Sequence, residues 1–473
     1  MRYRAIVCRP ATGIVCLATL IGSAIAGAAE PVGWRTDGTG RYADARVPMQ
    51  WSSEQNVLWS TSMPERSNAI PCIVGNRIFV CAEPEMLLCV DAADGQILWK
   101  VSHSYMDLLD DDAAAEARQI LADAEQADQK RGQLPGQLKP LQRKLKKNPD
   151  DAELTQQVAA IKQEIEQLQA ISDKAAQLRR PDAHGVNGHS TPTPVSDGQH
   201  VYVLAGNGVA AAYDMNGKRQ WARLIERPKH GWGQSSSPVL IDDKLIVLIN
   251  RLYALDKDTG EEIWQTASDQ HWGSPVPMRI GEVDVIVTPG GDIIRAADGH
   301  ALVRDLAKLE YSAPLVHDDV IYFMQGKPAA YRLPETVEGD SVTPDKLWPD
   351  LEIKGDRYYA SPVYHDGIVY AIQLQSRLTA MDAATGQHLY EKKLDLGEGT
   401  IYPSLVVAGN VIFASSDNGT TIVIQPGREY VELGRNHLEP FRSSPVCVGD
   451  RLYVRTHGNL YCIAEASTAS DAP

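Results

Sequence analysis

The sequence predicts an all-β fold: an eight-bladed β-propeller of four-stranded antiparallel blades, closed by an N-terminal strand and carrying an inserted α-helical coiled-coil hairpin. Three observations lead to this prediction: a strand motif headed by proline that recurs eight times, a glycine turn followed by an aromatic residue, and one segment with a helical heptad pattern. The length of 473 residues by itself would allow one large domain or two to three ordinary ones. The repeats therefore decide the fold class.

The first motif consists of small or polar residues, a proline, a short apolar strand, a turn and a second apolar strand. The copy that begins at Ser237-Pro238-Val239 and leads to Leu245-Ile246 is typical. From the second copy onward the prolines recur every 37–48 residues, a period typical of a four-stranded propeller blade. The prolines assigned to the eight copies are Pro71, Pro192, Pro238, Pro275, Pro314, Pro362, Pro403 and Pro445.

The second motif is a turn with a glycine, followed four residues later by an aromatic side chain. Glycine suits a positive-φ position in a tight turn between two antiparallel strands. The aromatic residue then has a fixed place on the outer strand, where it can pack between neighbouring blades. The residues of this motif are Gly95 with Trp99, Gly217 with Trp221, Gly260 with Trp264, and Gly386 with Tyr390.

The last copy is incomplete, because the 28 residues after Pro445 suffice for only three strands. Near the N-terminus, Asn56-Val57-Leu58-Trp59 resembles Gln96-Ile97-Leu98-Trp99, the outer strand of the first blade. We therefore predict that the strand with Trp59 completes the eighth blade and leaves no sheet edge exposed.

One long interval, between Pro71 and Pro192, breaks the period, and its residues 105–181 have a helical pattern. Asn148-Pro149-Asp150 is a helix-start signal. An Ala-rich helix over about 111–130 can pair with the following helix, and we expect glycines and prolines to break the connection: Gly132, Pro135, Gly136 and Pro140. The heptad positions of the second helix are Leu154, Ile161, Leu168 and Ala175. The hairpin is either a self-contained excursion or a docking arm for a protein partner.

The N-terminus has the pattern of a secretory signal peptide over residues 1–28, ending in Ala26-Gly27-Ala28. A periplasmic or extracellular protein is therefore expected. The formal charge of −15 argues against nucleic acid as a partner, and no internal stretch has the ~20 apolar residues of a membrane span. We divide the chain into the signal peptide at 1–28, an N-terminal segment with the closing strand and first blade at 29–104, the helical hairpin at 105–181, blades two to eight at 182–463, and a disordered tail at 464–473.

Five cysteines remain after the signal peptide, and they show no metal-ligand spacing. Export permits disulfides, and Cys81 and Cys89 could face each other across a hairpin. Alternatively, all five are small buried side chains. They are Cys72, Cys81, Cys89, Cys447 and Cys462.

The segment Leu252-Tyr-Ala-Leu-Asp-Lys-Asp-Thr-Gly-Glu-Glu-Ile-Trp264 resembles the PQQ-like, or quinoprotein alcohol dehydrogenase-like, β-propeller repeat. The arrangement is similar to that of the outer-membrane assembly factor BamB. Trp34-Arg35-Thr36-Asp37-Gly38 is similar to the N-terminal segment of exported PQQ-like proteins of planctomycete type. The resemblance covers roughly 33–104 and 183–463. It implies either a non-enzymatic scaffold that binds an envelope or periplasmic protein, or a PQQ-dependent oxidoreductase, because the same repeat serves both.

The dehydrogenases among these relatives use an adjacent cysteine pair, a calcium site built from Glu, Asn and Asp, and a catalytic Asp. This sequence has no adjacent cysteine pair, and no motif in it places the calcium ligands. We therefore expect no catalytic residues, cofactor or metal, with PQQ and calcium as the alternative.

One rim of the central channel is the predicted ligand site. Residues three positions before each proline should lie at matching points around the axis, and many of them are aromatic. Such a rim could hold a planar, acidic or peptide ligand in a sensor, or its side chains could fill the channel and satisfy one another. With their neighbours, the predicted rim residues are Asn68, His189, Gln234, Ser235, His271, Trp272, Tyr311, Tyr359, Tyr402 and Arg442.

Overall fold

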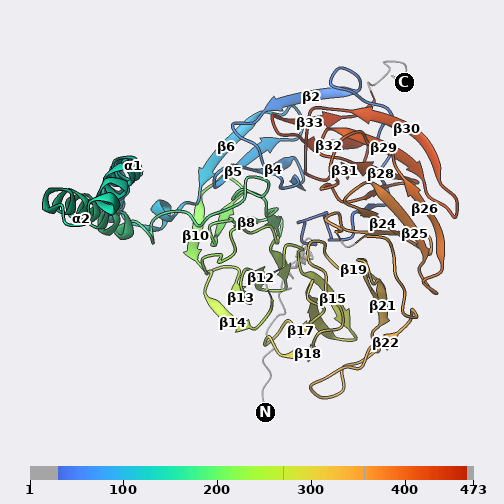
Figure 1. The fold of residues 1–473 in the computed structure, drawn as a ribbon. Coiled ribbons are helices and arrows are strands. Elements are labelled where there is room, and N and C mark those ends of the chain that lie inside the picture. The colour runs from blue at the N-terminus through green and yellow to red at the C-terminus, as the bar shows by residue number, and fades with distance from the viewer. Residues whose placement is uncertain (1–29, 270, 356, 466–473) are drawn as a thin grey trace, which may run out of the picture.

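The strands of the chain assemble into sheets that are arranged around a common centre (Figure 1). The computed structural model describes residues 30–269, 271–355 and 357–465, so the predicted signal peptide lies outside the described residues. Within these ranges there are eight sheets, seven of four strands and one of five, and almost all neighbouring strands pair antiparallel. This mostly β architecture fits a β-propeller and confirms the predicted class in that form.

We number the sheets 1 to 8 in the order in which their two middle strands occur along the chain. Sheet 1 comprises β3 (Cys72–Val74), β4 (Arg77–Ala82), β5 (Met86–Asp91) and β6 (Ile97–Ser102). Sheet 2 comprises β7 (Val195–Ser196), β8 (His200–Leu204), β9 (Val209–Asp214) and β10 (Arg219–Leu224). Sheet 3 comprises β11 (Val239–Ile241), β12 (Lys244–Leu248), β13 (Leu252–Asp256) and β14 (Glu262–Thr266). Sheet 4 comprises β15 (Val276–Ile280), β16 (Val283–Val287), β17 (Ile293–Arg295) and β18 (Ala301–Val303).

The remaining sheets repeat this plan. Sheet 5 comprises β19 (Leu315–His317), β20 (Val320–Phe323), β21 (Ala329–Arg332) and β22 (Asp345–Lys346). Sheet 6 comprises β23 (Val363–His365), β24 (Ile368–Gln373), β25 (Arg377–Asp382) and β26 (His388–Lys393). Sheet 7 comprises β1 (Arg41–Tyr42), β27 (Val406–Ala408), β28 (Val411–Ser415), β29 (Thr420–Gln425) and β30 (Val431–His437). Sheet 8 comprises β31 (Val446–Val448), β32 (Arg451–Arg455), β33 (Asn459–Ile463) and β2 (Val57–Ser62).

The hydrophobic core lies between neighbouring sheets. Both central strands of a sheet are almost continuously buried, as in β4 and β5, whereas the outer strand β6 alternates with exposed positions. This pattern arises because a central strand has a neighbouring sheet on each of its faces. One such core cluster joins Leu204 and Ala212 of sheet 2 to Leu245 and Val247 of sheet 3.

The N-terminal segment runs past several sheets before it becomes a strand. Val32 bridges to Ser196 of sheet 2, and β1 pairs parallel with β27 of sheet 7. Strand β2 then pairs antiparallel with β33, so that the two ends of the described chain share sheet 8 (Figure 1).

Tryptophan rings connect neighbouring sheets at five of the eight junctions between the described sheets. The indole of Trp221 on β10 donates a hydrogen bond to the carbonyl of Lys257 (2.8 Å) and covers Gly260 in sheet 3. A Cβ atom on Gly260 would lie 2.5 Å from that ring. The same contact joins Trp59 to Gly95, Trp99 to Gly217, Trp264 to Gly299, and Trp348 to Gly386. Each of these five tryptophan rings thus packs on a glycine turn of the following sheet.

Tyr390 occupies the matching place on β26, but it makes a different contact. Its ring lies edge-on to that of Tyr430 at 6.3 Å. Its hydroxyl is buried and has no hydrogen-bond partner among the residues that the structure describes.

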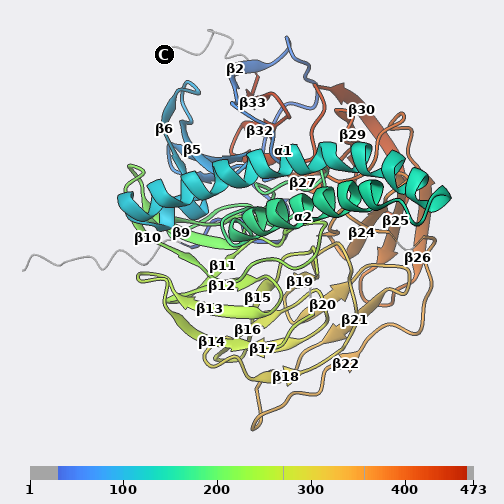
Figure 2. The ribbon, with the colours of Figure 1, turned by 60° about the vertical axis from the view of Figure 1, so that its left-hand side comes forward.

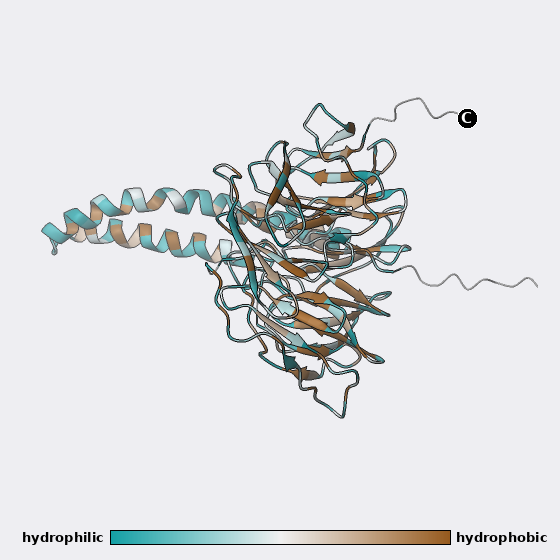
Figure 3. Ribbon diagram, turned by 90° about the vertical axis from the view of Figure 1, so that its right-hand side faces the viewer, coloured by the Kyte–Doolittle hydropathy of each residue, from teal (hydrophilic) through white to brown (hydrophobic). Residues whose placement is uncertain are grey.

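Two helices project from the sheets between sheet 1 and sheet 2 (Figures 2 and 3). After the short 3-10 helix η1 (Tyr105–Leu108), α1 (Asp111–Lys147) runs outward and α2 (Ala152–Lys174) returns. Asp110 and Asp151 cap the two N-termini by accepting backbone N–H bonds. We call η1, α1 and α2 the arm. No helix in the described ranges is long and apolar enough to cross a bilayer.

The predicted break in the first helix is wrong, because α1 continues through Gly132, Pro135, Gly136 and Pro140. A proline inside a helix removes one backbone hydrogen bond and clashes with the preceding turn, at a cost of about 3 kcal/mol. Ala127 and Leu134 of α1, the latter directly before Pro135, pack against Leu168 of α2, and this packing helps to offset the cost. The contact between the helices therefore outweighs the low helix propensity of these glycines and prolines.

Replacing Pro135 and Pro140 by alanine should stabilise the arm by about 1–3 kcal/mol, because two interior prolines disappear from a continuous helix. Hydrogen exchange at the backbone of residues 131–147 should slow accordingly. Faster exchange in the double variant would show that the prolines fit α1 better than alanine does.

The cysteines of the described chain are free and buried. In the pairing of β4 with β5, Cys81 lies opposite Leu87 and Cys89 lies opposite Phe79. The two thiols therefore do not face each other across the hairpin, and the possible disulfide between them is wrong. Burial raises the pKa of the Cys81 thiol to about 12, as expected for a side chain that packs rather than reacts.

Candidate ligand-binding cavity

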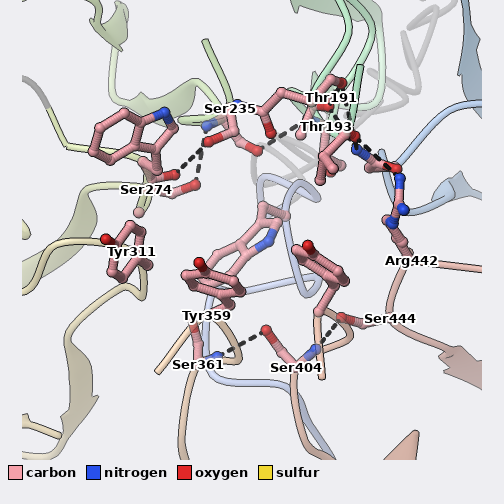
Figure 4. A pocket seen from close by; sticks show the side chains of 18 of the residues that line it. Thr191, Thr193, Ser235, Ser274, Tyr311, Tyr359, Ser361, Ser404, Arg442 and Ser444 are labelled. Carbon is pink, nitrogen blue, oxygen red and sulfur yellow. Dashed lines mark hydrogen bonds between the residues drawn. The ribbon is translucent and has the colours of Figure 1, made fainter. Parts of the chain in front are cut away.

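A cavity of about 490 Å³ lies where the loops before the innermost strands of all eight sheets converge; these strands are β3, β7, β11, β15, β19, β23, β27 and β31 (Figure 4). Its wall has two layers of side chains, and the residues of each layer have matching positions in the repeats. The deeper layer consists of residues two positions before these innermost strands, and the upper layer lies two residues before the deeper one.

Six residues of the deeper layer carry hydroxyl groups that link neighbouring sheets. The backbone N–H of Thr193 donates to Ser237 Oγ, and that of Ser237 donates to Ser274 Oγ, both at 2.9 Å. The N–H groups of Ala313, Ser361 and Ser404 donate in the same way to the serine of the next sheet, and that of Ile70 donates to Thr193 Oγ1. We call these six hydroxyl-bearing residues the hydroxyl ring: Thr193, Ser237, Ser274, Ser361, Ser404 and Ser444.

Four residues of the upper layer form a continuous aromatic arc. Trp272 stacks on Tyr311 with ring centroids 5.7 Å apart, Tyr311 meets Tyr359 edge-on at 4.6 Å, and Tyr359 stacks on Tyr402 at 5.3 Å. The guanidinium of Arg442 lies 5.0 Å from the centre of the Tyr402 ring and continues the series. We call Trp272, Tyr311, Tyr359 and Tyr402 the aromatic arc.

Seven of the ten predicted rim residues line this cavity: Asn68, Ser235, Trp272, Tyr311, Tyr359, Tyr402 and Arg442. His189 does not, since it directs Nε2 at the carbonyl of Pro181 (2.9 Å). Gln234 is buried and donates to the carbonyl of Leu248. His271 is also buried, burial lowers its pKa, and neither ring nitrogen has a partner among the described residues.

The misplacement of His189 has a simple origin in the repeat. Strand β7 begins directly after Pro194, so Pro194, rather than Pro192, is the proline that matches Pro238 and Pro362. The equivalent rim residue is therefore Thr191, which does line the cavity. Sheet 7 shows the same shift. Strand β27 begins directly after Leu405, so Leu405 occupies the position that matches Pro194, and Pro403 lies two residues before it.

The N-terminal segment contributes Trp34 to the cavity wall, and Arg35 holds this segment in place. Arg35 is 1% exposed and donates to the carbonyls of Pro362 and Leu405, both at 2.9 Å. Burial lowers the pKa of its guanidinium to about 10. Trp34 and Arg35 belong to no repeat, so the repeat pattern does not predict their place in the wall.

Other residues of the wall come from loops that lie outside the motifs, and they were missed for that reason. Trp232 is 47% exposed at the mouth and stacks on His184 at 3.9 Å, while His230 lies edge-on to Trp272 at 5.0 Å. Arg357 and Glu310 add one positive and one negative charge to the wall.

The wall does not fit a calcium-bound quinone cofactor. Calcium takes six to eight oxygen ligands, among which carboxylates dominate. Glu310 is the only carboxylate among the described lining residues, and the described part of the chain holds no group of three His, Cys, Asp or Glu side chains placed to hold a metal ion.

The chain matches the family model described as outer membrane protein assembly factor BamB, over residues 48–266 and 249–470. It belongs to this BamB family. The match covers most of the sequence and includes four strands of every sheet, while the short strand β1 precedes it. No curated protein matches the chain significantly.

Solved structures of the BamB family and of quinoprotein dehydrogenases share the fold. BamB from Moraxella catarrhalis has a TM-score of 0.54 at 12% identity, covering 86% of this chain and 99% of that one. Quinohemoprotein alcohol dehydrogenase from Comamonas testosteroni has a TM-score of 0.54 at 11% identity, covering 93% and 82%. A europium-containing methanol dehydrogenase has a TM-score of 0.53 at 10% identity, covering 91% and 98%. At these identities the likeness concerns the fold alone.

Proposed function

We propose that this member of the BamB family is an exported, non-enzymatic scaffold of the cell envelope, which binds a protein partner through its arm. Its body is an eight-bladed propeller closed by β2. Support for the closed ring comes from the eight sheets, the pairing of β2 with β33 and the hydrogen bonds of the hydroxyl ring between sheets. Support for export comes from the signal-peptide pattern of residues 1–28 and from the outer-membrane description of the family.

The observation that carries the proposal is that the arm extends away from the sheets while its root is firmly fixed (Figure 3). The Tyr105 hydroxyl donates to the carbonyl of Asn207 (2.6 Å), and the Arg227 guanidinium lies 4.7 Å from the centre of the Tyr105 ring. Arg227 also donates to the carbonyl of Arg179 (2.6 Å) just after α2, and Arg180 pairs with Glu85 (3.2 Å) in sheet 1.

These contacts fix where the arm points before any partner arrives. An element that is already ordered loses less conformational entropy on binding than a flexible one does. The helices pack on each other through a short seam, and most of their remaining surface is exposed. A fixed, extended helical surface suits recognition of another protein, as the assembly function named for the family suggests.

Replacing residues 111–174 by a short Gly-Ser linker should leave a folded propeller that no longer retains its partner. The test is cross-linking and pull-down from envelope extract with the full chain and with the deleted chain side by side, after circular dichroism has shown that both are folded. The Arg428→Gln variant, changed on the loop before β30, should capture the same partner as the unchanged chain. Equal capture by the deleted chain would contradict the role of the arm.

The alternative function is a PQQ-dependent periplasmic oxidoreductase, for which the shared fold is the support. The side chains of the cavity wall argue against this function, because they do not provide the carboxylate ligands of a calcium-bound quinone. Titration with PQQ and Ca²⁺, followed by absorption spectra and by dye reduction with alcohols, distinguishes the two functions. Stoichiometric binding with turnover would overturn the scaffold proposal.

A further inference from the structure

The apolar surface of the central cavity is almost entirely aromatic. Besides the aromatic arc it includes Trp34 and Trp232, whereas Ile70 and Val186 are the aliphatic side chains among the described lining residues. Aliphatic peptide side chains or an acyl chain would therefore find little matching surface. Faces of aromatic rings suit a flat ring whose own faces are apolar.

The hydroxyl ring supplies a second feature, a set of hydrogen-bond donors without acceptors. Each hydroxyl oxygen of the ring accepts one backbone N–H, with N···O distances of 2.9–3.1 Å. Its own O–H proton is not used in that bond. None of the six hydroxyl groups donates to another described residue, so the O–H groups are available to a ligand with several acceptor oxygens. The close view shows five of these residues, Thr193, Ser274, Ser361, Ser404 and Ser444, around the cavity (Figure 4).

Arg442 supplies the third feature, a guanidinium with spare donors. Its side chain is 17% exposed, and its Nε lies 3.6 Å from Asp417 Oδ2 without forming a hydrogen bond. Its one hydrogen bond to a described residue is long, 3.4 Å from Nη1 to the carbonyl of Val186. A guanidinium fork with free N–H groups binds a carboxylate in two-pronged fashion.

From these three features we propose that the cavity binds a short saccharide that contains a uronic acid. A pyranose ring has faces of C–H groups and a rim of oxygens, so its faces would lie on the aromatic arc and its rim on the hydroxyl ring. The carboxylate of the uronic acid pairs with Arg442. The cavity volume of about 490 Å³ lies within the range of ~300–1,000 Å³ common for small-molecule sites. This inference goes beyond the scaffold function and does not depend on the arm.

The test titrates the full mature chain with hexuronate-containing disaccharides, with their neutral counterparts and with benzoate, which is a planar acid without hydroxyls. Binding is followed by calorimetry and by tryptophan fluorescence, because Trp34, Trp232 and Trp272 line the cavity. At least one uronate disaccharide should bind with a Kd below about 1 mM and about tenfold more tightly than its neutral counterpart. No saccharide binding, or equally tight binding of benzoate, would overturn the proposal.

Two variants locate the site. Arg442→Gln should remove the about tenfold preference for the uronate and leave binding of the neutral sugar unchanged. Tyr359→Ala should weaken both by about tenfold, because it removes the centre of the aromatic arc. The controls Arg428→Gln and Tyr430→Ala change the same residue types outside the cavity lining and should leave binding unchanged. A preference that survives Arg442→Gln, in a variant with an unchanged melting temperature, contradicts the assignment.

Discussion

The Gly260→Ala variant should lose about 2–5 kcal/mol of the free energy of unfolding. Gly260 has φ +71°, and a side chain there costs about 1–2 kcal/mol on conformational grounds. The new Cβ would also lie 2.5 Å from the Trp221 ring, and overpacking of this kind costs about 1–3 kcal/mol more. Denaturant unfolding of the two proteins measures the difference.

Gly367→Ala is the matched control for this loss. Gly367 has φ +79° in the turn between β23 and β24, and a Cβ there would have nothing within 4 Å. It should show only the conformational cost of about 1–2 kcal/mol. Equal losses in the two variants would mean that the contact between Trp221 and its glycine does not hold the sheets together. A larger loss for Gly260→Ala supports the view that these contacts join neighbouring sheets.

The same contact shows what the sequence could and could not predict. The spacing of glycine and aromatic residue predicted a ring packed between blades, and Trp99, Trp221 and Trp264 do pack on the following sheet. Trp348 was missed because its sheet has a long loop, rather than a short glycine turn, before the outer strand. Gly299 was missed because no aromatic residue follows it at the expected spacing, although it receives the ring of Trp264.

The candidate cavity was partly predictable for a related reason. Most of the predicted rim residues line it, because the repeat places one side chain per sheet at the same depth. Where two prolines compete, as Pro192 and Pro194 do, the sequence pattern does not fix the register, and the hydrogen bond from Thr193 to Ser237 does. Trp34 and Trp232 belong to single-copy segments, whose positions depend on long-range packing that periodicity does not encode.

The hydroxyl ring both joins neighbouring sheets and lines the cavity. Small or polar residues precede the prolines of the repeat, and the sequence alone assigns them no role. In the structure they accept backbone N–H groups that would otherwise be buried without partners, and this explains why serine and threonine occupy these positions. Because the same oxygens face the cavity, the joints between sheets also provide its polar wall.

Mild acid should destabilise the protein through His103, which lies at the root of the arm between β6 and η1. Its ring is buried, and burial lowers its pKa from 6.5 to about 4, although the nearby Asp107 raises it. Between pH 6.5 and 4 the unfolded chain takes up a proton that the folded chain does not, so stability falls as the pH falls. The pKa difference corresponds to a loss of about 3 kcal/mol at pH 4.

The His103→Gln variant should therefore lose about 3 kcal/mol less between pH 7 and pH 4 than the unchanged chain does, as measured by urea unfolding at each pH. The exposed control His300→Gln should keep the full slope. Glu85 acts in the opposite direction, since burial raises its pKa and the folded chain binds its proton more readily. The backbone N–H of His103 donates to the carbonyl of Glu85, whose side chain pairs with Arg180 just after α2, so protonation of His103 disturbs the contacts that anchor the arm. Hydrogen exchange over residues 102–110 should therefore accelerate before global unfolding, and simultaneous loss of the propeller would contradict this order.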